Sequence, residues 1–158
     1  MQFSINNILY KNELLSKLIY NNDNTVMSKS AKIKIISFKV AFNDYIRDYS
    51  NFIYNLNKEL MSERHWHLFE NRLTISIQEQ FELNQLDESI SEARNKRIEE
   101  KINTIVDIPE ITKDSFLTKE EYKSLLDVNV DRTVVVVDTM VDGAVFCEEI
   151  YKEFVYTE

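Results

Sequence analysis

The chain of 158 residues contains one glycine, Gly143, and one proline, Pro109. Glycine supplies the positive φ angles of tight hairpins and lets the backbone approach a phosphate closely. A chain with one glycine therefore has little means of building a multi-stranded sheet with tight turns. It has equally little means of building a glycine-rich nucleotide loop, so the common nucleotide-binding folds are disfavoured.

Cysteine is just as scarce, because Cys147 is the only one. A lone cysteine cannot form an internal disulfide or a cysteine metal cluster, which is typical of a reducing compartment. The first residues lack the basic segment and apolar run of a secretory signal. The longest purely aliphatic run, Val134 to Val137, is far shorter than the roughly 20 residues that span a bilayer. We therefore expect a soluble, cytoplasmic protein with no membrane partner.

The chain does have a normal share of hydrophobic residues, 44%, and a net charge of −8. Its length and composition predict a single helical domain over residues 1–158, with a core of its own. The charge is uneven: residues 1–62 carry a net +3, residues 63–107 a net −4 and residues 108–158 a net −7. This asymmetry bears on partners, and it allows the first and last thirds of two chains to attract each other.

Apolar residues recur at helical spacing over residues 4–20, where Ser4 is the expected N-cap. A second series steps by four and three residues through Ala31, Ile35, Phe38, Phe42, Tyr45, Tyr49, Phe52 and Leu56. This is a heptad-type pattern, and Ile36, Ile46 and Ile53 widen its apolar face. We expect a long helix that packs in a bundle.

A third helical stretch is expected from the N-cap Ser62 to about Val106. Its first apolar face would comprise Trp66, Phe69, Leu73, Ile77 and Phe81. Residues 31–40 and 73–83 also alternate apolar and polar side chains, as strands do. The helical interpretation is favoured because turn residues bound neither segment and the helical period continues beside both.

Shorter elements are expected after Pro109, which ends the third stretch. Thr118 and Glu121 have the spacing of a capping box before a short helix through Leu126. The β-branched residues Val134–Val137 predict a short buried strand or extended segment.

Thr139 and Asp142 predict the start of a last helix, which continues to Val155. A hairpin turning at Asp142 and Gly143 is the alternative, because Asp-Gly is a strong turn signal. Together the patterns predict a mainly α fold. It is a helical bundle built on a long antiparallel hairpin of the second and third helices, with room for one or two short C-terminal strands.

The only two histidines and the only tryptophan are neighbours: His65, Trp66 and His67. On a helix the two histidines lie about 200° apart and cannot share a metal ion. We therefore predict no metal and no cofactor. Trp66 is expected to anchor the start of a helix, with the histidines at its edge. An enzyme that uses His65 or His67 as a base is the alternative.

Carboxylates gather in the last third, and those that could form a functional acidic surface are Asp138, Asp142, Glu148, Glu149 and Glu153. Displayed on one face, they would imitate a phosphate backbone. The chain would then inhibit a nucleic-acid-binding enzyme, as a protein of a mobile element could. The same acidity disfavours direct binding of duplex nucleic acid.

The favoured function is a non-catalytic one, because the sequence shows no convergent catalytic set. Eight tyrosines, nine phenylalanines and one tryptophan are more than a small core easily covers. Aromatic side chains are common anchors of protein interfaces. We therefore expect a helical interaction module or regulator that binds another protein, with self-association as a further alternative. The candidate contact residues are His65, Trp66, His67 and the five carboxylates named above.

Overall fold

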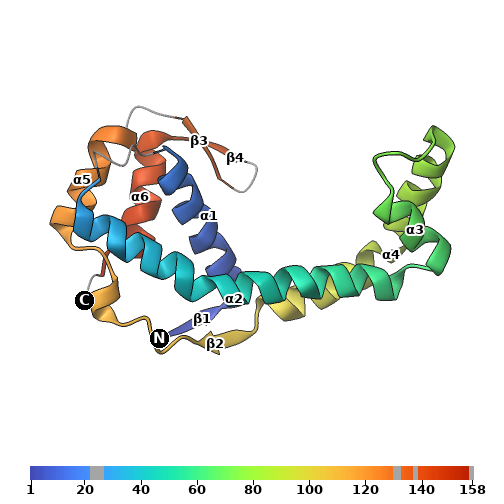
Figure 1. Ribbon diagram of the computed structural model, residues 1–158, viewed down its shortest axis with the longest axis horizontal. Coiled ribbons are helices and arrows are strands. Elements are labelled where there is room, and N and C mark those ends of the chain that lie inside the picture. The colour runs from blue at the N-terminus through green and yellow to red at the C-terminus, as the bar shows by residue number, and fades with distance from the viewer. Residues whose placement is uncertain (22–26, 130–132, 137–138, 157–158) are drawn as a thin grey trace. The chain divides into compact units, whose positions relative to one another are not determined.

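The computed structural model describes residues 1–21, 27–129, 133–136 and 139–156 (Figure 1). In these ranges the α-helices are α1 (Ile5–Asn21), α2 (Lys29–Leu60), α3 (Glu63–Glu70), α4 (Ile77–Ile102), α5 (Lys119–Asn129) and α6 (Gly143–Phe154). The strands are β1 (Gln2–Ser4), β2 (Ile105–Asp107), β3 (Thr133–Val136) and β4 (Thr139–Asp142), and a 3-10 turn covers Lys113–Ser115. The predicted mainly α fold with short strands is confirmed. No helix of the described residues is long and apolar enough to cross a membrane.

The contacts between described residues group the chain into two compact units. Unit 1 comprises residues 1–46 and 105–158, and unit 2 comprises residues 47–104. Helix α2 contributes its first half to unit 1 and its second half to unit 2. Each unit has buried apolar residues of its own. The single domain expected over residues 1–158 stays a prediction.

Phe38 on α2 lies at the centre of an aromatic cluster in unit 1. Its ring centroid is 5.8 Å from that of Phe42, 5.4 Å from Phe116 and 5.2 Å from Phe154. Phe3 meets Phe42 edge to face at 5.8 Å. Aromatic pairs favour these distances and tilted arrangements. Helices α1 and α6 complete this core with Ile8, Leu14, Leu15, Leu18, Phe146 and Ile150.

The apolar series predicted for α2 is the one that unit 1 buries. Ala31, Ile35, Phe38 and Phe42 are almost completely covered. The strand alternative for residues 31–40 is wrong, because the whole segment is helical. A strand would bury Ile33 on the same face as Ile35, whereas the helix leaves Ile33 exposed.

Strands β1 and β2 form an antiparallel pair that the sequence analysis did not predict. Phe3 pairs with Val106 in this register and turns its side chain into the core. Helix α4 ends at Ile102, so the predicted extension of the third helix to Val106 is wrong. Three residues are too few to show a strand period, and this pair forms only because folding brings the two segments together. Ser4 then caps α1 as predicted, since its Oγ accepts a hydrogen bond from the Asn7 N–H at 3.0 Å.

The capping box predicted before α5 is confirmed. The Thr118 Oγ1 accepts a hydrogen bond from the Glu121 N–H at 3.2 Å. The Glu121 carboxylate accepts one from the Thr118 N–H at 2.9 Å. Helix α5 runs on to Asn129, beyond the expected end at Leu126.

Strand β3 confirms the strand predicted from Val134, while Val137 lies outside the described residues. It pairs antiparallel with β4, which occupies Thr139–Asp142. The predicted start of the last helix at Thr139 is therefore wrong. The backbone of residues 139–142 pairs with β3 and so is not available for the first turn of a helix. Helix α6 begins at Gly143 with Asp142 as its N-cap. The alternative hairpin turn at these two residues is also wrong.

Candidate interaction site at the start of helix α4

Unit 2 consists of the second half of α2, the short helix α3 and the long helix α4. Helices α2 and α4 run antiparallel, since the Lys101 ammonium lies 5.5 Å from the Phe52 ring and Arg97 donates to Glu59 at 2.9 Å. This is the antiparallel pairing that the sequence predicts. The buried apolar residues of this unit are Leu56, Met61, Trp66, Leu68 and Leu83. The core that positions the site is therefore small.

Trp66 anchors α3 on α2, as its position at the start of a helix predicts. Its ring meets Tyr54 of α2 edge to face at 5.0 Å and stacks on Phe69 at 5.5 Å. The Arg72 guanidinium lies 4.5 Å from the Phe69 ring centroid, close enough for a cation–π contact. These ring contacts fix α3 against α2, and Phe69 lies directly before the turn that leads into α4.

His65 connects the start of α3 to α4 through both of its ring nitrogens. Its Nδ1 lies 2.6 Å from the Ser62 Oγ, and its Nε2 lies 3.4 Å from the Glu82 carboxylate. The Arg64 guanidinium donates two hydrogen bonds to the same carboxylate, at 3.2 and 3.0 Å. The hydrogen bonds from Arg64 hold the pKa of Glu82 below its usual range. Ser62 is also the predicted N-cap, because its Oγ accepts from the His65 N–H at 3.2 Å.

The two histidines do not converge. Helix α3 is continuous from Glu63 to Glu70, and His67 is exposed while His65 is held by its neighbours. Within the described ranges no group of three histidine, cysteine or carboxylate side chains could hold a metal ion. The structure thus brings together Ser62, His65 and Glu82 by contacts that join α3 to α4.

Residues 71–76 separate α3 from α4, so the single helical stretch predicted from Ser62 onwards is wrong. Asn71 caps the end of α3, and Ser76 caps the start of α4. The Ser76 Oγ accepts from the Glu79 N–H at 3.1 Å, and the Glu79 carboxylate accepts from the Ser76 N–H at 3.1 Å. A serine three residues before a glutamate is the signature of a capping box, and it could have located this boundary. The turn at residues 71–76 follows neither the helical period nor the strand period that the sequence shows over residues 73–83.

Three apolar side chains around this boundary lie open to solvent. The exposed fraction is 95% for Leu73, 91% for Ile77 and 62% for Phe81. The helical period predicts that they share a core face with Trp66, and that prediction is wrong. The cap at Ser76 turns the helix so that Leu83 faces the unit while Ile77 and Phe81, four residues apart, face outward. We call Leu73, Ile77 and Phe81 the α4 site.

The acidic candidates of the last third lie in unit 1, where most of them have internal partners. Asp142 caps α6 by accepting from the Val145 N–H at 2.9 Å. Glu149 accepts a hydrogen bond from the Tyr10 hydroxyl at 2.7 Å. Glu153 pairs with Lys11 at 2.8 Å. Glu148 is exposed, and Asp138 lies outside the described residues.

These contacts change the properties of the groups that meet the acidic residues. Burial, the hydrogen bond to Glu149 and the negative charge of Glu149 all raise the pKa of Tyr10. Burial lowers the pKa of Lys11 more than its bond to Glu153 raises it. Fewer carboxylates therefore remain for an outward acidic display than the sequence suggests.

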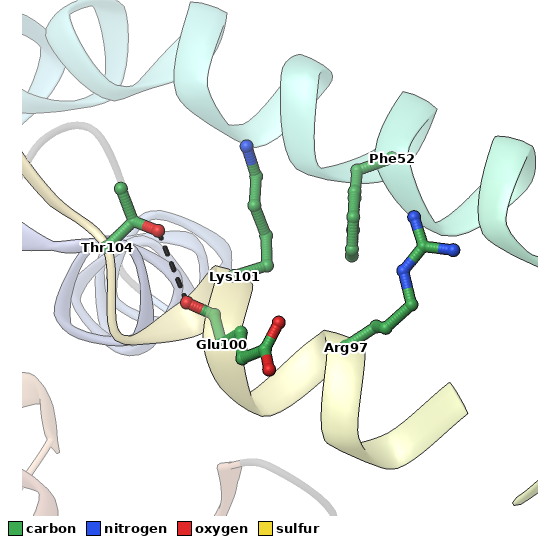
Figure 2. A pocket seen from close by; sticks show the side chains of 5 residues that line it. All are labelled: Phe52, Arg97, Glu100, Lys101 and Thr104. Carbon is green, nitrogen blue, oxygen red and sulfur yellow. Dashed lines mark hydrogen bonds between the residues drawn. The ribbon is translucent and has the colours of Figure 1, made fainter. Parts of the chain in front are cut away.

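A hollow of about 270 Å³ also lies in unit 2, between α2 and the end of α4 (Figure 2). Phe52, Arg97, Glu100, Lys101 and Thr104 line it. Figure 2 shows the Phe52 ring reaching down from α2 beside the two cationic side chains of α4. Both cations already have partners, because Arg97 is bound by Glu59 and Lys101 lies over Phe52. Of the two cations, only Arg97 has its charge compensated within the described residues, by the carboxylate of Glu59.

Comparisons of the chain with protein-family models, with curated proteins and with solved structures give no match. The function is therefore inferred from the geometry of the chain alone.

Proposed function

We propose that this chain is a non-catalytic interaction module that binds another protein through the α4 site. The observation that carries the proposal is the exposure of Leu73, Ile77 and Phe81 around one helix start. Covering an apolar side chain of this size contributes about 1.5–3 kcal/mol. A partner that covers all three would gain a substantial part of the free energy of a specific complex.

The geometry around the site supports such a role. The capping box of Ser76 and Glu79 fixes where α4 begins, so Ile77 and Phe81 are presented from a regular helix. Trp66 and Phe69 stack on each other in α3, which leads into the turn that carries Leu73. A side chain presented by a rigid element loses little conformational entropy on binding, which favours affinity.

The two alternative functions have less support. A nucleic-acid mimic needs carboxylates directed outward, whereas Glu149 and Glu153 are bound to Tyr10 and Lys11. An enzyme based on His65 needs a nitrogen that can reach a substrate, and both nitrogens are next to Ser62 and Glu82. We place the module in the cytoplasm, because Cys147 is the only cysteine of the chain, and a chain without an internal disulfide is typical of a reducing compartment.

The test is an affinity pull-down from lysate of the native source with the tagged full chain. A variant carrying Leu73→Ser, Ile77→Ser and Phe81→Ser should lose a protein that the wild-type chain retains. The matched control carries Ile105→Ser and Val145→Ser, which remove exposed apolar side chains elsewhere. It should retain that protein. Circular dichroism must show that both variants fold, and identical captured proteins for all three chains would contradict the proposal.

A further inference from the structure

Unit 1 carries a second row of exposed apolar side chains, on the first half of α2. The exposed fraction is 56% for Ile33, 49% for Ile36 and 71% for Val40. Their spacing of three and four residues places them on one face of the helix. The buried series that includes Ile35 and Phe42 occupies the opposite face of the helix. The three exposed side chains therefore do not belong to the core. We call Ile33, Ile36 and Val40 the α2 stripe.

The charge around the α2 stripe is positive. Residues 29–43 contain four lysines and no aspartate or glutamate. Lys34 is bound by Glu121 and Lys39 by Asn12 and Ser16. Lys29 is exposed in the first turn, four residues before Ile33 and on the same face.

The first half of α4, by contrast, is acidic. Residues 77–92 contain five carboxylates and no lysine or arginine. Two of these carboxylates are paired with arginines from outside the segment, Glu82 with Arg64 and Asp87 with Arg94. Glu88 and Glu92 are exposed, and both lie on the same face of α4 as Phe81, because seven and eleven residues correspond to about two and three turns.

The two exposed faces also match in spacing. Val40 and Ile36 are four residues apart, as are Ile77 and Phe81. Lys29 lies seven residues before Ile36, and Glu88 lies seven residues after Phe81. Both intervals span roughly 10 Å along a helix axis. Laid antiparallel, the helices would place the apolar pairs together and the lysine opposite the glutamate.

We infer that the partner of the α4 site is a second copy of this chain, which docks with its α2 stripe. In this contact Val40 of one copy lies opposite Ile77 of the other, Ile36 opposite Phe81, and Lys29 opposite Glu88. The inference rests on the proposed function, because it names the occupant of the same site. Two different surfaces meet, so the contact is heterologous and adds copies head to tail. Screening of Lys29 and Glu88 by salt weakens it.

The first test is complementation between two full-length variants in sedimentation velocity. One carries Ile36→Asp and Val40→Asp, and the other carries Ile77→Asp and Phe81→Asp. Each retains one intact surface and should stay monomeric alone, while the wild-type chain associates as its concentration rises. A mixture should form a one-to-one heterodimer, because the intact surface of each variant meets that of the other. Since only folded variants can pair, the heterodimer also shows that neither substitution prevents folding.

The second test exchanges the charges. Lys29→Glu or Glu88→Lys alone should weaken self-association about two- to five-fold, as expected for an exposed ion pair. The two changes in one chain restore the pair in reverse and should recover the wild-type association. Equal weakening in the single and double variants would overturn the register.

A wild-type chain that remains monomeric at every concentration and salt level would overturn the inference. So would a mixture of the two aspartate variants that forms no heterodimer although circular dichroism shows both to be folded. These outcomes are distinct from failure of the proposed function. If the pull-down still yields a different protein that is lost on changing Leu73, Ile77 and Phe81, the interaction function stands with another partner.

Discussion

Two buried charged side chains show how single residues hold unit 1 together. The side chain of Lys11 is 6% exposed and that of Glu153 is 15% exposed, and their charged atoms are 2.8 Å apart. The Lys11 ammonium also donates to the Glu153 backbone oxygen at 2.6 Å and lies 5.0 Å from the Phe154 ring centroid. An ion pair in this setting contributes little by itself, but removing one partner leaves a charge without compensation.

Replacing Glu153 with glutamine should therefore lower the free energy of unfolding by about 3 kcal/mol, because it leaves the Lys11 ammonium buried without its counter-charge. Urea denaturation at neutral pH measures the change. The matched control is Glu13→Gln, which removes the carboxylate 3.9 Å from Lys17 in a much more exposed pair. The control should change stability by less than about 0.5 kcal/mol. Equal effects of the two substitutions would show that burial of Lys11 is unimportant.

Glu121 predicts a dependence of stability on pH. Desolvation raises its pKa, but the hydrogen bonds from Lys34 and Thr118 outweigh that effect and lower the pKa from 4.5 to about 2. The folded protein therefore keeps this carboxylate ionised at a pH where the unfolded chain takes up a proton. Its contribution to stability is complete above about pH 4.5 and is lost as the pH falls towards about 2.

Glu121→Gln should lower the free energy of unfolding at neutral pH by about 2 kcal/mol, because it removes the charge from these hydrogen bonds. The difference from the wild-type chain should shrink steadily as the pH falls from about 5 to about 2. Urea denaturation across this range gives the curves, with Glu99→Gln as an exposed control. A difference that stays constant with pH would exclude Glu121 as the group that titrates.

At the scale of elements, capping residues decide where the helices of unit 2 begin. Ser62 starts α3 and Ser76 starts α4, each by accepting a hydrogen bond from the N–H three residues ahead. Helix α4 buries only Leu83, so tertiary packing contributes little to defining its first turn. The capping box at Ser76 therefore sets the direction in which Ile77 and Phe81 face.

Ser76→Ala should lower the free energy of unfolding by about 1 kcal/mol, since the Glu79 N–H at the start of α4 loses its partner, the Ser76 hydroxyl. It should also weaken any binding at the α4 site, because the first turn then frays. Chemical denaturation followed by circular dichroism measures the first effect. Ser89→Ala is the control, as Ser89 lies within α4 and its hydroxyl donates only to the Leu86 carbonyl. A Ser76 variant as stable as the Ser89 variant would contradict the role of the cap.

At the scale of the whole molecule, the two units differ in how much apolar surface they bury. Unit 1 has a continuous core that contains Phe38, Phe42, Phe146 and Phe154. Leu83 is the one fully buried side chain of α4, the long helix of unit 2, and the ion pair of Arg97 with Glu59 joins this helix to α2. Exposed ion pairs contribute little to stability, whereas buried apolar area contributes most.

Hydrogen exchange should therefore be faster in α4 than in α1 and α6, because local opening of α4 exposes less apolar surface. Mass spectrometry of peptides from the full chain at low concentration checks this without contributions from self-association. Peptides covering residues 77–102 should lose protection before those covering residues 5–21. Uniform protection across both sets would mean that the units open together.

The features that depend on neighbouring residues could be predicted from the sequence. The caps at Ser4 and Ser62, the capping box of Thr118 and Glu121, and the long apolar face of α2 all follow from interactions within one or two helical turns. These short-range signals survive wherever the segment lies in the fold. The capping box at Ser76 is also a short-range signal. It was not predicted because an apolar series at helical spacing continues across it from Trp66 to Phe81.

Tertiary structure alone decided which apolar and charged side chains are covered. Periodicity treated Leu73, Ile77 and Phe81 as core, yet no helix or strand of the described residues covers them. The pairing of Lys11 with Glu153 and that of β1 with β2 could not be predicted either, because each joins segments that are far apart in the sequence. A helical period states which side chains share a face, whereas burial depends on which distant segment lies against that face. The candidate site is thus a product of the fold, built from residues whose pattern alone predicts a core.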